Sequence, residues 1–356
     1  MYRIKTAVAL IIGYAMVAGQ AEAAGWTDTV TIKGFASVNY ERSNAAEPFN
    51  GEENVGIDDQ GSLSGTRMGL NINARINERL RFASQLFASK DAEFAVNVDW
   101  AFGVLTLTDQ LDLRTGKIKF PVGLVNEYVD VGYVTPWIQA PAVIYSELGA
   151  PNGPQMTRES FTGISLLGQQ AIAGDWLLEA DLFGGEIDLD GISVRELSGI
   201  TLRADWDDTV QFQLSSYEGT MRGTGTVMGG AMEGVKHEGV LYGAKADWND
   251  VIFYAERGDI TMGDITAMKA TSWYTTVGYR IGKLLPHLTY QNYEQGEVDD
   301  EQTITTLGLR WDFMPGVALK VELGQIKTDK GNGLFPQGSS PADTVNTTGF
   351  GLDMVF

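Results

Sequence analysis

Alternation of apolar with small or polar residues is the dominant pattern along this chain. Near the C-terminus, mostly apolar residues occupy every second position, and glycine, aspartate or valine lies between them. These residues are Thr348, Phe350, Leu352, Met354 and Phe356. Three other stretches, 67–76, 200–206 and 305–313, show the same two-residue period. Because successive side chains of a β-strand point to opposite faces, each stretch predicts a strand with one apolar face.

The length of these stretches and the position of their aromatic residues favour strands that cross a membrane. The stretches run to about 9–11 residues, the length that a tilted strand needs to cross a bilayer, whereas strands of globular proteins cluster near 5–6. Aromatic side chains gather at the strand ends, where an outer-membrane barrel carries its interfacial girdles. They are Tyr40, Trp206, Trp248, Tyr279, Trp311 and Phe313. We therefore expect the apolar face to meet lipid and the alternate face to meet the lumen.

Tight turns and longer polar connections divide the chain into hairpins. The tight-turn residues Asn, Asp, Gly and Pro recur in short pairs at 77–78, 109–110, 174–175, 207–208, 249–250, 282–283 and 315–316. Longer connections lie near 41–65, 121–160, 186–194, 220–236, 262–269, 296–302 and 328–345, with an exceptionally short one at 90–92. Outer-membrane barrels place short turns on the periplasmic side and longer loops outside.

The spacing of the turns predicts about 16 strands, an even number as in bacterial single-chain barrels, and leaves 14 or 18 open. The alternation is least regular at 103–120. The first strand, about 30–40, is expected to pair with the last, about 346–356, with both termini on the periplasmic side. Closure is needed because an open edge in lipid would leave backbone groups unsatisfied. The predicted fold class is all-β: a transmembrane antiparallel up-and-down β-barrel.

The first 23 residues predict a cleaved signal peptide. Arg3 and Lys5 form a positive n-region, 6–17 is an apolar run, and Ala21-Glu22-Ala23 has the small-x-small form of a cleavage site. The run is too short to span a bilayer of about 30 Å as a helix. A buried N-terminal helix is the alternative. Cleavage after Ala23 would leave residues 24–356 as a single barrel domain, exported from the cytoplasm of a Gram-negative bacterium.

Composition and charge exclude several classes of function. The chain has 43 Gly, 10 Pro and no Cys, which removes disulfides, thiol nucleophiles and thiolate metal sites together. After residue 24 no stretch approaches the roughly 20 apolar residues of a transmembrane helix. The net charge of -20 argues against nucleic acid as a partner, because phosphate binding needs a basic stripe. Carboxylates on external loops would fit a surface facing cation-bridged lipopolysaccharide, although general solubility is the simpler explanation.

Both ends of the mature chain resemble the Gram-negative outer-membrane porins. The closing strand, 347–356, looks like the C-terminal signature that the barrel-assembly machinery recognises, with Phe356 as its last residue. The opening strand, 30–40, is similar to the first strand of such porins. The resemblance implies a 16-stranded water-filled channel of the general-diffusion type, which assembles as a homotrimer. It also implies that the third external loop folds into the barrel.

The connection 121–160 is the third outer loop by this count, and the longest. Half of the chain's 10 prolines fall within it, which forbids a regular strand there. A long insertion in a compact fold is usually functional. The loop is therefore the candidate constriction loop, unless it lies on the rim as an external loop. Its candidate constriction residues are Glu127, Tyr128, Asp130, Tyr133, Trp137 and Glu147.

Basic residues recur at positions with the lumen-facing parity of separate strands. They are Lys33, Arg67, Arg75, Arg81, Arg203, Lys245, Arg280, Arg310 and Lys320. Facing the loop carboxylates, they would create a transverse field, and opposed rows of charge tune ion selectivity. Alternatively, each pairs with a neighbouring carboxylate and only holds strands together. Acidic residues such as Asp247, Asp312 and Asp353 share the same parity, so the lumen is mixed and no ion preference follows.

Passive diffusion of small hydrophilic solutes and ions is the function that these patterns favour. A substrate-specific channel for an anion, sugar or peptide, a surface receptor or adhesin, and a soluble periplasmic β-protein are the alternatives. Catalysis has little support, since only His237 and His287 are present and no Gly-x-Ser-x-Gly motif occurs. The acidic loops could attract Ca²⁺ but lack the spacing of an EF-hand. We expect no enzyme activity, no cofactor and no metal.

Overall fold

The structure is a computed structural model that describes residues 29–51, 56–90, 92–146, 160–172, 174–189, 192–223, 226–227, 230–231, 233–263, 269–295, 299–336, 338–339 and 341–356. The predicted signal peptide and Glu147 lie outside these residues. In the part of the chain so described, no helix is long and apolar enough to cross a membrane.

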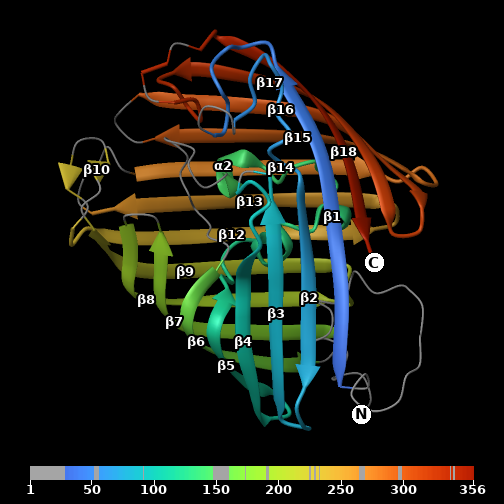
Figure 1. The fold of residues 1–356 in the computed structure, drawn as a ribbon, viewed down its shortest axis with the longest axis vertical. Helices are drawn as coiled ribbons and strands as arrows, with labels where there is room; N and C mark the ends of the chain where they lie inside the picture. Colours follow the sequence, from blue (N-terminus) through green and yellow to red (C-terminus); the bar gives the residue numbers. More distant parts are fainter. Residues whose placement is uncertain are drawn as a thin grey trace.

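Sixteen strands of the described chain close into one antiparallel barrel (Figure 1). In chain order they are β1 (Val30–Ser43), β2 (Arg67–Arg75), β3 (Leu80–Ser89), β4 (Asn97–Thr108), β5 (Leu111–Lys119), β6 (Ser160–Ile172), β7 (Trp176–Leu189), β8 (Ile192–Trp206), β9 (Val210–Gly223), β12 (Lys236–Trp248), β13 (Val251–Met262), β14 (Lys269–Tyr279), β15 (Leu284–Gln295), β16 (Asp300–Met314), β17 (Val317–Lys330) and β18 (Thr344–Val355). Outside the barrel, β10 (Thr226–Val227) and β11 (Gly230–Ala231) form a small ribbon. The predicted strand number and fold class are therefore confirmed.

The predicted hairpins correspond to the observed ones at every tight turn, and two outer connections differ. The connection between β3 and β4 runs over 90–96 and is longer than the predicted 90–92, because strand pairing begins only at Asn97. Between β7 and β8 the pairing continues to Leu189 and Ile192, so the connection is shorter than the predicted 186–194. Arg195 forms ion pairs with Glu186 and Asp188 across this extension, and the pairing shifts register between Gly185 and Ile187. The irregular alternation at 103–120 coincides with a register shift between β4 and β5.

The barrel closes where the first strand meets the last. β1 and β18 pair from Phe35 opposite Val355 to Ser43 opposite Thr347. Beyond this ladder, the amides and carbonyls of Gly34 and Phe356 exchange hydrogen bonds of 2.8 and 2.9 Å. The Phe356 ring is largely exposed on the outer wall. Closure thus gives hydrogen-bond partners to backbone groups that an open edge would leave without them.

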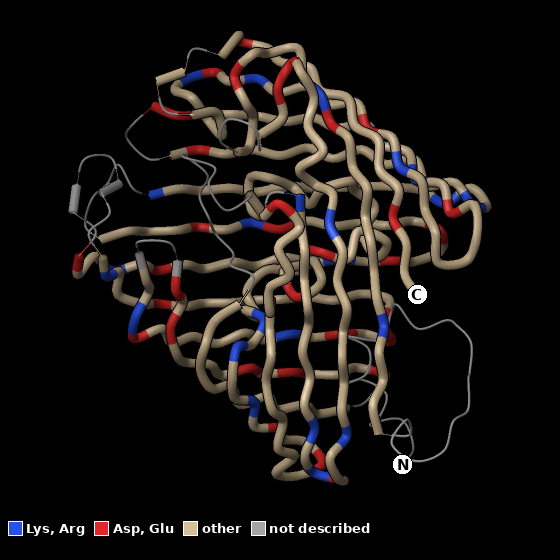
Figure 2. Tube along the Cα trace, in the orientation of Figure 1, with Lys and Arg blue, Asp and Glu red and all other residues tan. Residues whose placement is uncertain are grey.

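The two faces of the wall differ as the alternation predicts. Large apolar side chains such as Ile32, Leu307 and Phe350 are more than half exposed on the outside. Side chains of the other parity, such as Ser37 and Asp181, are about 1% exposed. Burial of the inner face shows that the barrel interior is largely filled. Lys and Arg are interspersed with Asp and Glu along the strands (Figure 2).

Two glycines allow β6 and β7 to approach closely. Gly163 lies opposite Gly185, and a Cβ added to Gly163 would lie 2.1 Å from the carbonyl oxygen of Gly184 and 2.8 Å from the Cα of Gly185. Both obstacles are backbone atoms, so no side-chain rotation can relieve the contact.

We therefore expect Gly163→Ala to destabilise the barrel by roughly 1–3 kcal/mol, the range of overpacking in a well-packed interior. Urea titration of the heat-modifiable gel band measures the change. Gly103→Ala is the matched control, because a Cβ there has nothing within 4 Å. Equal midpoints for the two variants would show that the strands can separate freely.

Candidate functional site

The connection between β5 and β6 folds into the barrel as predicted, over its described part, 120–146. It contains the short helices η1 (Asn126–Tyr128), η2 (Gly132–Val134) and α2 (Ala142–Tyr145). α2 lies inside the ring of strands, against β14 and β15, whereas η2 contacts β18 and β1 (Figure 1). We call residues 120–146 the inner loop.

The inner loop begins against β8 and β9. The carbonyl oxygen of Pro121 accepts hydrogen bonds from Thr201 Oγ1 (2.9 Å), Arg203 Nη2 (3.3 Å) and Gln213 Nε2 (3.3 Å). Phe120 packs into an aromatic group of inward-facing rings. Its ring centroid lies 6.1 Å from Phe161, 5.4 Å from Phe183 and 5.3 Å from Tyr217. This end of the loop is therefore held by both polar and apolar contacts.

The middle of the inner loop crosses to β13, β14 and β15. Trp137 is 2% exposed and donates through Nε1 to Thr276 Oγ1 and Thr289 Oγ1, both at 3.0 Å. Its ring meets Tyr254 edge to face, with centroids 4.9 Å apart. On β13, Glu256 accepts a hydrogen bond of 2.9 Å from the Leu124 amide.

The same loop also reaches β17 and β18, where Lys320 holds it. The Lys320 ammonium forms an ion pair of 2.7 Å with Asp353 and donates to the carbonyl oxygens of Gly132 (2.7 Å) and Trp137 (2.5 Å). A Cβ on Gly132 would lie 2.2 Å from Asp353 Oδ1, so only glycine fits at this approach. The inner loop thus spans the bore between opposite walls.

Two predicted constriction residues are in fact buried anchors. Trp137 and Asp130 are 2% and 5% exposed, because both point into protein contacts and not into open water. Asp130 pairs with Lys119 at 2.8 Å, and Arg67 donates to its backbone oxygen at 2.9 Å. Glu127 contacts Arg203 directly at 2.6 Å. At Asp130 and Glu127, therefore, the loop carboxylates are paired with wall cations by direct contact and do not face them across an open gap.

The basic set has the predicted inward parity but divides into several groups. Arg81, Arg280 and Arg310 pair with Asp112, Asp247 and Asp312, as the alternative interpretation held. Lys320, 1% exposed, cannot line open water, which corrects its assignment as pore-lining. Neither Lys33 nor Arg75 forms an ion pair with any residue that the structure describes. Most of these basic side chains are paired because acidic residues alternate with basic ones on the same inner face.

A cavity of about 370 Å³ remains between the inner loop and the wall. Glu127, Tyr128 and Tyr133 line it from the loop, and Arg203, Lys245, Arg280 and Arg310 line it from the wall. Lys245 Nζ lies 3.1 Å from the Tyr128 hydroxyl and 5.1 Å from its ring centroid. Arg310 lies 4.9 Å from the centroid of Tyr133. Tyrosine rings of the loop therefore cover two of the wall cations.

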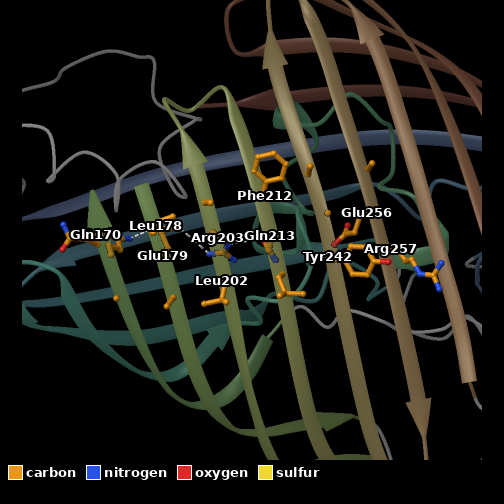
Figure 3. Close-up of a pocket in the computed structure, with 18 of the residues that line it drawn as sticks. Gln170, Leu178, Glu179, Leu202, Arg203, Phe212, Gln213, Tyr242, Glu256 and Arg257 are labelled. Atoms are coloured by element: carbon orange, nitrogen blue, oxygen red, sulfur yellow. Dashed lines mark hydrogen bonds and ion pairs between the residues drawn. The ribbon is translucent and has the colours of Figure 1, made fainter. Parts of the chain in front are cut away.

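A larger hollow of about 1250 Å³ crosses the outer wall over β6–β9 and β12–β14 (Figure 3). Its side chains include Leu178, Leu202, Phe212 and Tyr242, which are 41–50% exposed and belong to the apolar face. Arg257 lies at its edge, paired with Asp259 at 2.9 Å. This hollow faces away from the lumen, so it is not part of the solute path. Among the described residues no group of three or more potential ligands could hold a metal ion.

Several site residues were not predicted from the sequence. Phe161, Phe183 and Tyr217 have inward parity, yet a water-filled lumen gives no reason for buried aromatic rings there. Aromatic residues at these inward positions could therefore have indicated that a loop packs against this wall. Glu256 and Lys119 gave no such signal, because their partners come from the aperiodic inner loop.

The chain matches the family model of Gram-negative porins over residues 203–331. This part of the chain is therefore similar to the Gram-negative porins. The match runs from the second half of β8 into the outer loop after β17, so it covers less than half of the chain. A search of curated proteins finds no match to the sequence.

Solved structures similar to this chain show the same fold. The anion-selective porin from Comamonas acidovorans is 17% identical, with a TM-score of 0.63, and the match covers 92% of this chain and 99% of that chain. Salmonella typhi OmpF, in a complex with daunomycin, is 14% identical, with a TM-score of 0.62, and 92% and 97% are covered. Vibrio cholerae OmpT is 12% identical, with a TM-score of 0.59, and 95% and 100% are covered. The chain accordingly has the barrel fold of these outer-membrane proteins.

Trp137→Phe replaces the indole with a benzene ring and removes the single Nε1–H bond that the two threonines share. A typical bond contributes about 1 kcal/mol, so we expect the amides of 120–146 to exchange hydrogen faster by roughly fivefold. Hydrogen–deuterium exchange at neutral pH measures this. Trp311→Phe, at a 45% exposed site on the outer wall, is the control. Unchanged protection of the loop in both variants would exclude Trp137 as an anchor.

Docking of the inner loop should weaken in acid. Burial alone would raise the pKa of Asp130, but Lys119 and Arg67 hold this pKa below its usual value near 4. A depressed pKa contributes stability that is complete above about pH 4 and is lost as the pH falls through the lower docked-state pKa. Near-ultraviolet circular dichroism of the packed aromatic rings, followed from pH 7 to pH 2, should therefore fall only in acid. Asp130→Asn should flatten this dependence, and an equally steep acid transition in Asp130→Asn would assign it to other groups.

Proposed function

We propose that this chain is a porin, a general-diffusion channel for small hydrophilic solutes and ions, with its narrowest part at the cavity beneath the inner loop. The observation that carries the proposal is the charged lining of that cavity. Arg280 and Asp247, at side-chain exposures of 37% and 52%, remain in contact with water although they pair with each other. Tyr128 and Tyr133 line the same cavity from the inner loop. Solutes would therefore pass beside Tyr128 and Tyr133.

The proposal includes the assembly and surroundings of the porin. A structure of Vibrio cholerae OmpT is described as a trimer, and the shared fold supports a homotrimer here. Export by the segment 1–23, recognition of Phe356 by the barrel-assembly machinery, and contact with outer-membrane lipid and lipopolysaccharide belong to the same proposal. The porin would act without catalysis and without a cofactor.

An anion-specific channel is the second candidate, since one structure with this fold is an anion-selective porin. The lining of the cavity argues against it. The described lining has five basic side chains, Lys33, Arg203, Lys245, Arg280 and Arg310, and six acidic ones, Glu127, Glu179, Asp205, Asp208, Asp247 and Asp312. Selectivity filters use rings of one sign. A lining with both signs supports weak ion selectivity.

Planar bilayer recording of the refolded protein tests the channel. We expect stepwise, persistent openings and, in a gradient of potassium chloride, a reversal potential close to zero, because the two signs of charge nearly cancel. Arg280→Gln should shift the reversal potential toward cation preference, since it leaves Asp247 unpaired at the cavity.

Two outcomes would contradict the proposal. A correctly folded barrel without openings would move the assignment to a closed receptor or adhesin. A strongly anion-selective reversal potential in the wild type would favour the second candidate over general diffusion. Heat-modifiable gel migration provides the folding control for each preparation.

A further inference from the structure

Charges of opposite sign alternate around the wall of the lumen cavity. Asp205 on β8 and Lys245 on β12 lie in one row of the inner face, because both are register partners of Gln211 on β9. Two residues after Lys245, Asp247 faces the same cavity and accepts two hydrogen bonds from Arg280 at the end of β14. Acid and base therefore follow each other from β8 to β14.

The alternation continues on β16 and β1. Arg310 binds Asp312 at 2.7 Å, and the side chain of Asp312 is 35% exposed. Lys33 projects from β1 into the same cavity. The two most exposed ion pairs of the lining, Arg280–Asp247 and Arg310–Asp312, therefore each present both signs to the cavity.

This arrangement treats solutes differently according to how their charge is distributed. An ion with one charge always meets a like-charged neighbour beside its partner, and that repulsion cancels much of the attraction. A small molecule with both charges can place its anionic group against a guanidinium and its cationic group against a carboxylate. Charge-assisted hydrogen bonds of this kind are the stronger ones. A neutral solute forms neither of these two charge-assisted contacts.

We propose that the cavity favours small zwitterionic solutes of the size of an α-amino acid, over neutral solutes and over ions of one charge. This inference rests on the proposed diffusion function and names its preferred substrate class. The cavity volume of about 370 Å³ lies within the range of small-molecule sites. The pair Arg280–Asp247 is its most accessible part, since both side chains are more than a third exposed.

Osmotic swelling of proteoliposomes tests the preference with two isomers. L-alanine and lactamide have the same atoms, but alanine is zwitterionic and lactamide is neutral. We expect the wild type to pass alanine roughly threefold faster than lactamide. A threefold ratio corresponds to about half the free energy of a tenfold preference. The double variant Asp247→Asn with Arg280→Gln removes both charges together and should reduce the ratio toward one.

The control removes an ion pair of the same kind outside the lumen. Lys330 and Asp299 pair at 3.1 Å, with side chains 55% and 82% exposed, and Lys330→Gln with Asp299→Asn should keep the wild-type ratio. Alaninamide hydrochloride and sodium lactate report the two single charges, and each should pass more slowly than alanine.

The possible outcomes distinguish a failure of the zwitterion preference from a failure of the diffusion function. Equal flux of alanine and lactamide through the wild type would overturn the zwitterion preference and leave the diffusion channel intact. The same holds if the lumen double variant keeps the wild-type ratio. No flux of either isomer through folded barrels would overturn the diffusion function itself.

Discussion

The whole structure depends on the requirement that backbone amides and carbonyls in lipid be hydrogen-bonded within the protein. A β-sheet meets this requirement only when its first and last strands join, and here β1 and β18 do so up to the exchange between Gly34 and Phe356. Closure also creates an interior that no neighbouring element can cover. The contents of that interior must come from inward-facing side chains and from a connection long enough to enter.

The inner loop fills that role by attachment at separated points of the wall. Its carbonyl groups have no partners of their own in a sheet, so side chains of the wall supply them. Lys320 illustrates the balance: two loop carbonyls and Asp353 surround an ammonium group that is 1% exposed. Burial of a charge at that depth is tolerable only because the pair and its hydrogen bonds are complete. The same contact that supports Lys320 therefore fixes the course of the loop.

The part of the inner wall that meets water is the part that the inner loop leaves uncovered. Tyr128 and Tyr133 lie over Lys245 and Arg310, and Glu127 neutralises Arg203. Much of the fixed charge on the inner wall is consumed by these contacts and by neighbouring carboxylates. The remaining lining carries both signs in alternation, which gives the lumen polarity without a strong field of one sign.

The sequence by itself determined the strands and their faces, and limited their number to about 16. A two-residue period assigns each of Ile32, Leu307 and Phe350 to the outer face without knowledge of any partner, and tight-turn residues define the hairpins locally. Inward parity of the basic residues follows from the same local rule. Only the tertiary structure decided which of them meet water. The loop that covers Lys320 has no period, and its contacts join residues such as Trp137 and Thr289 that lie 152 positions apart. Local geometry repeats along a chain and can be read from it, whereas the docking of an aperiodic segment depends on the shape of a bore that exists only after the barrel closes.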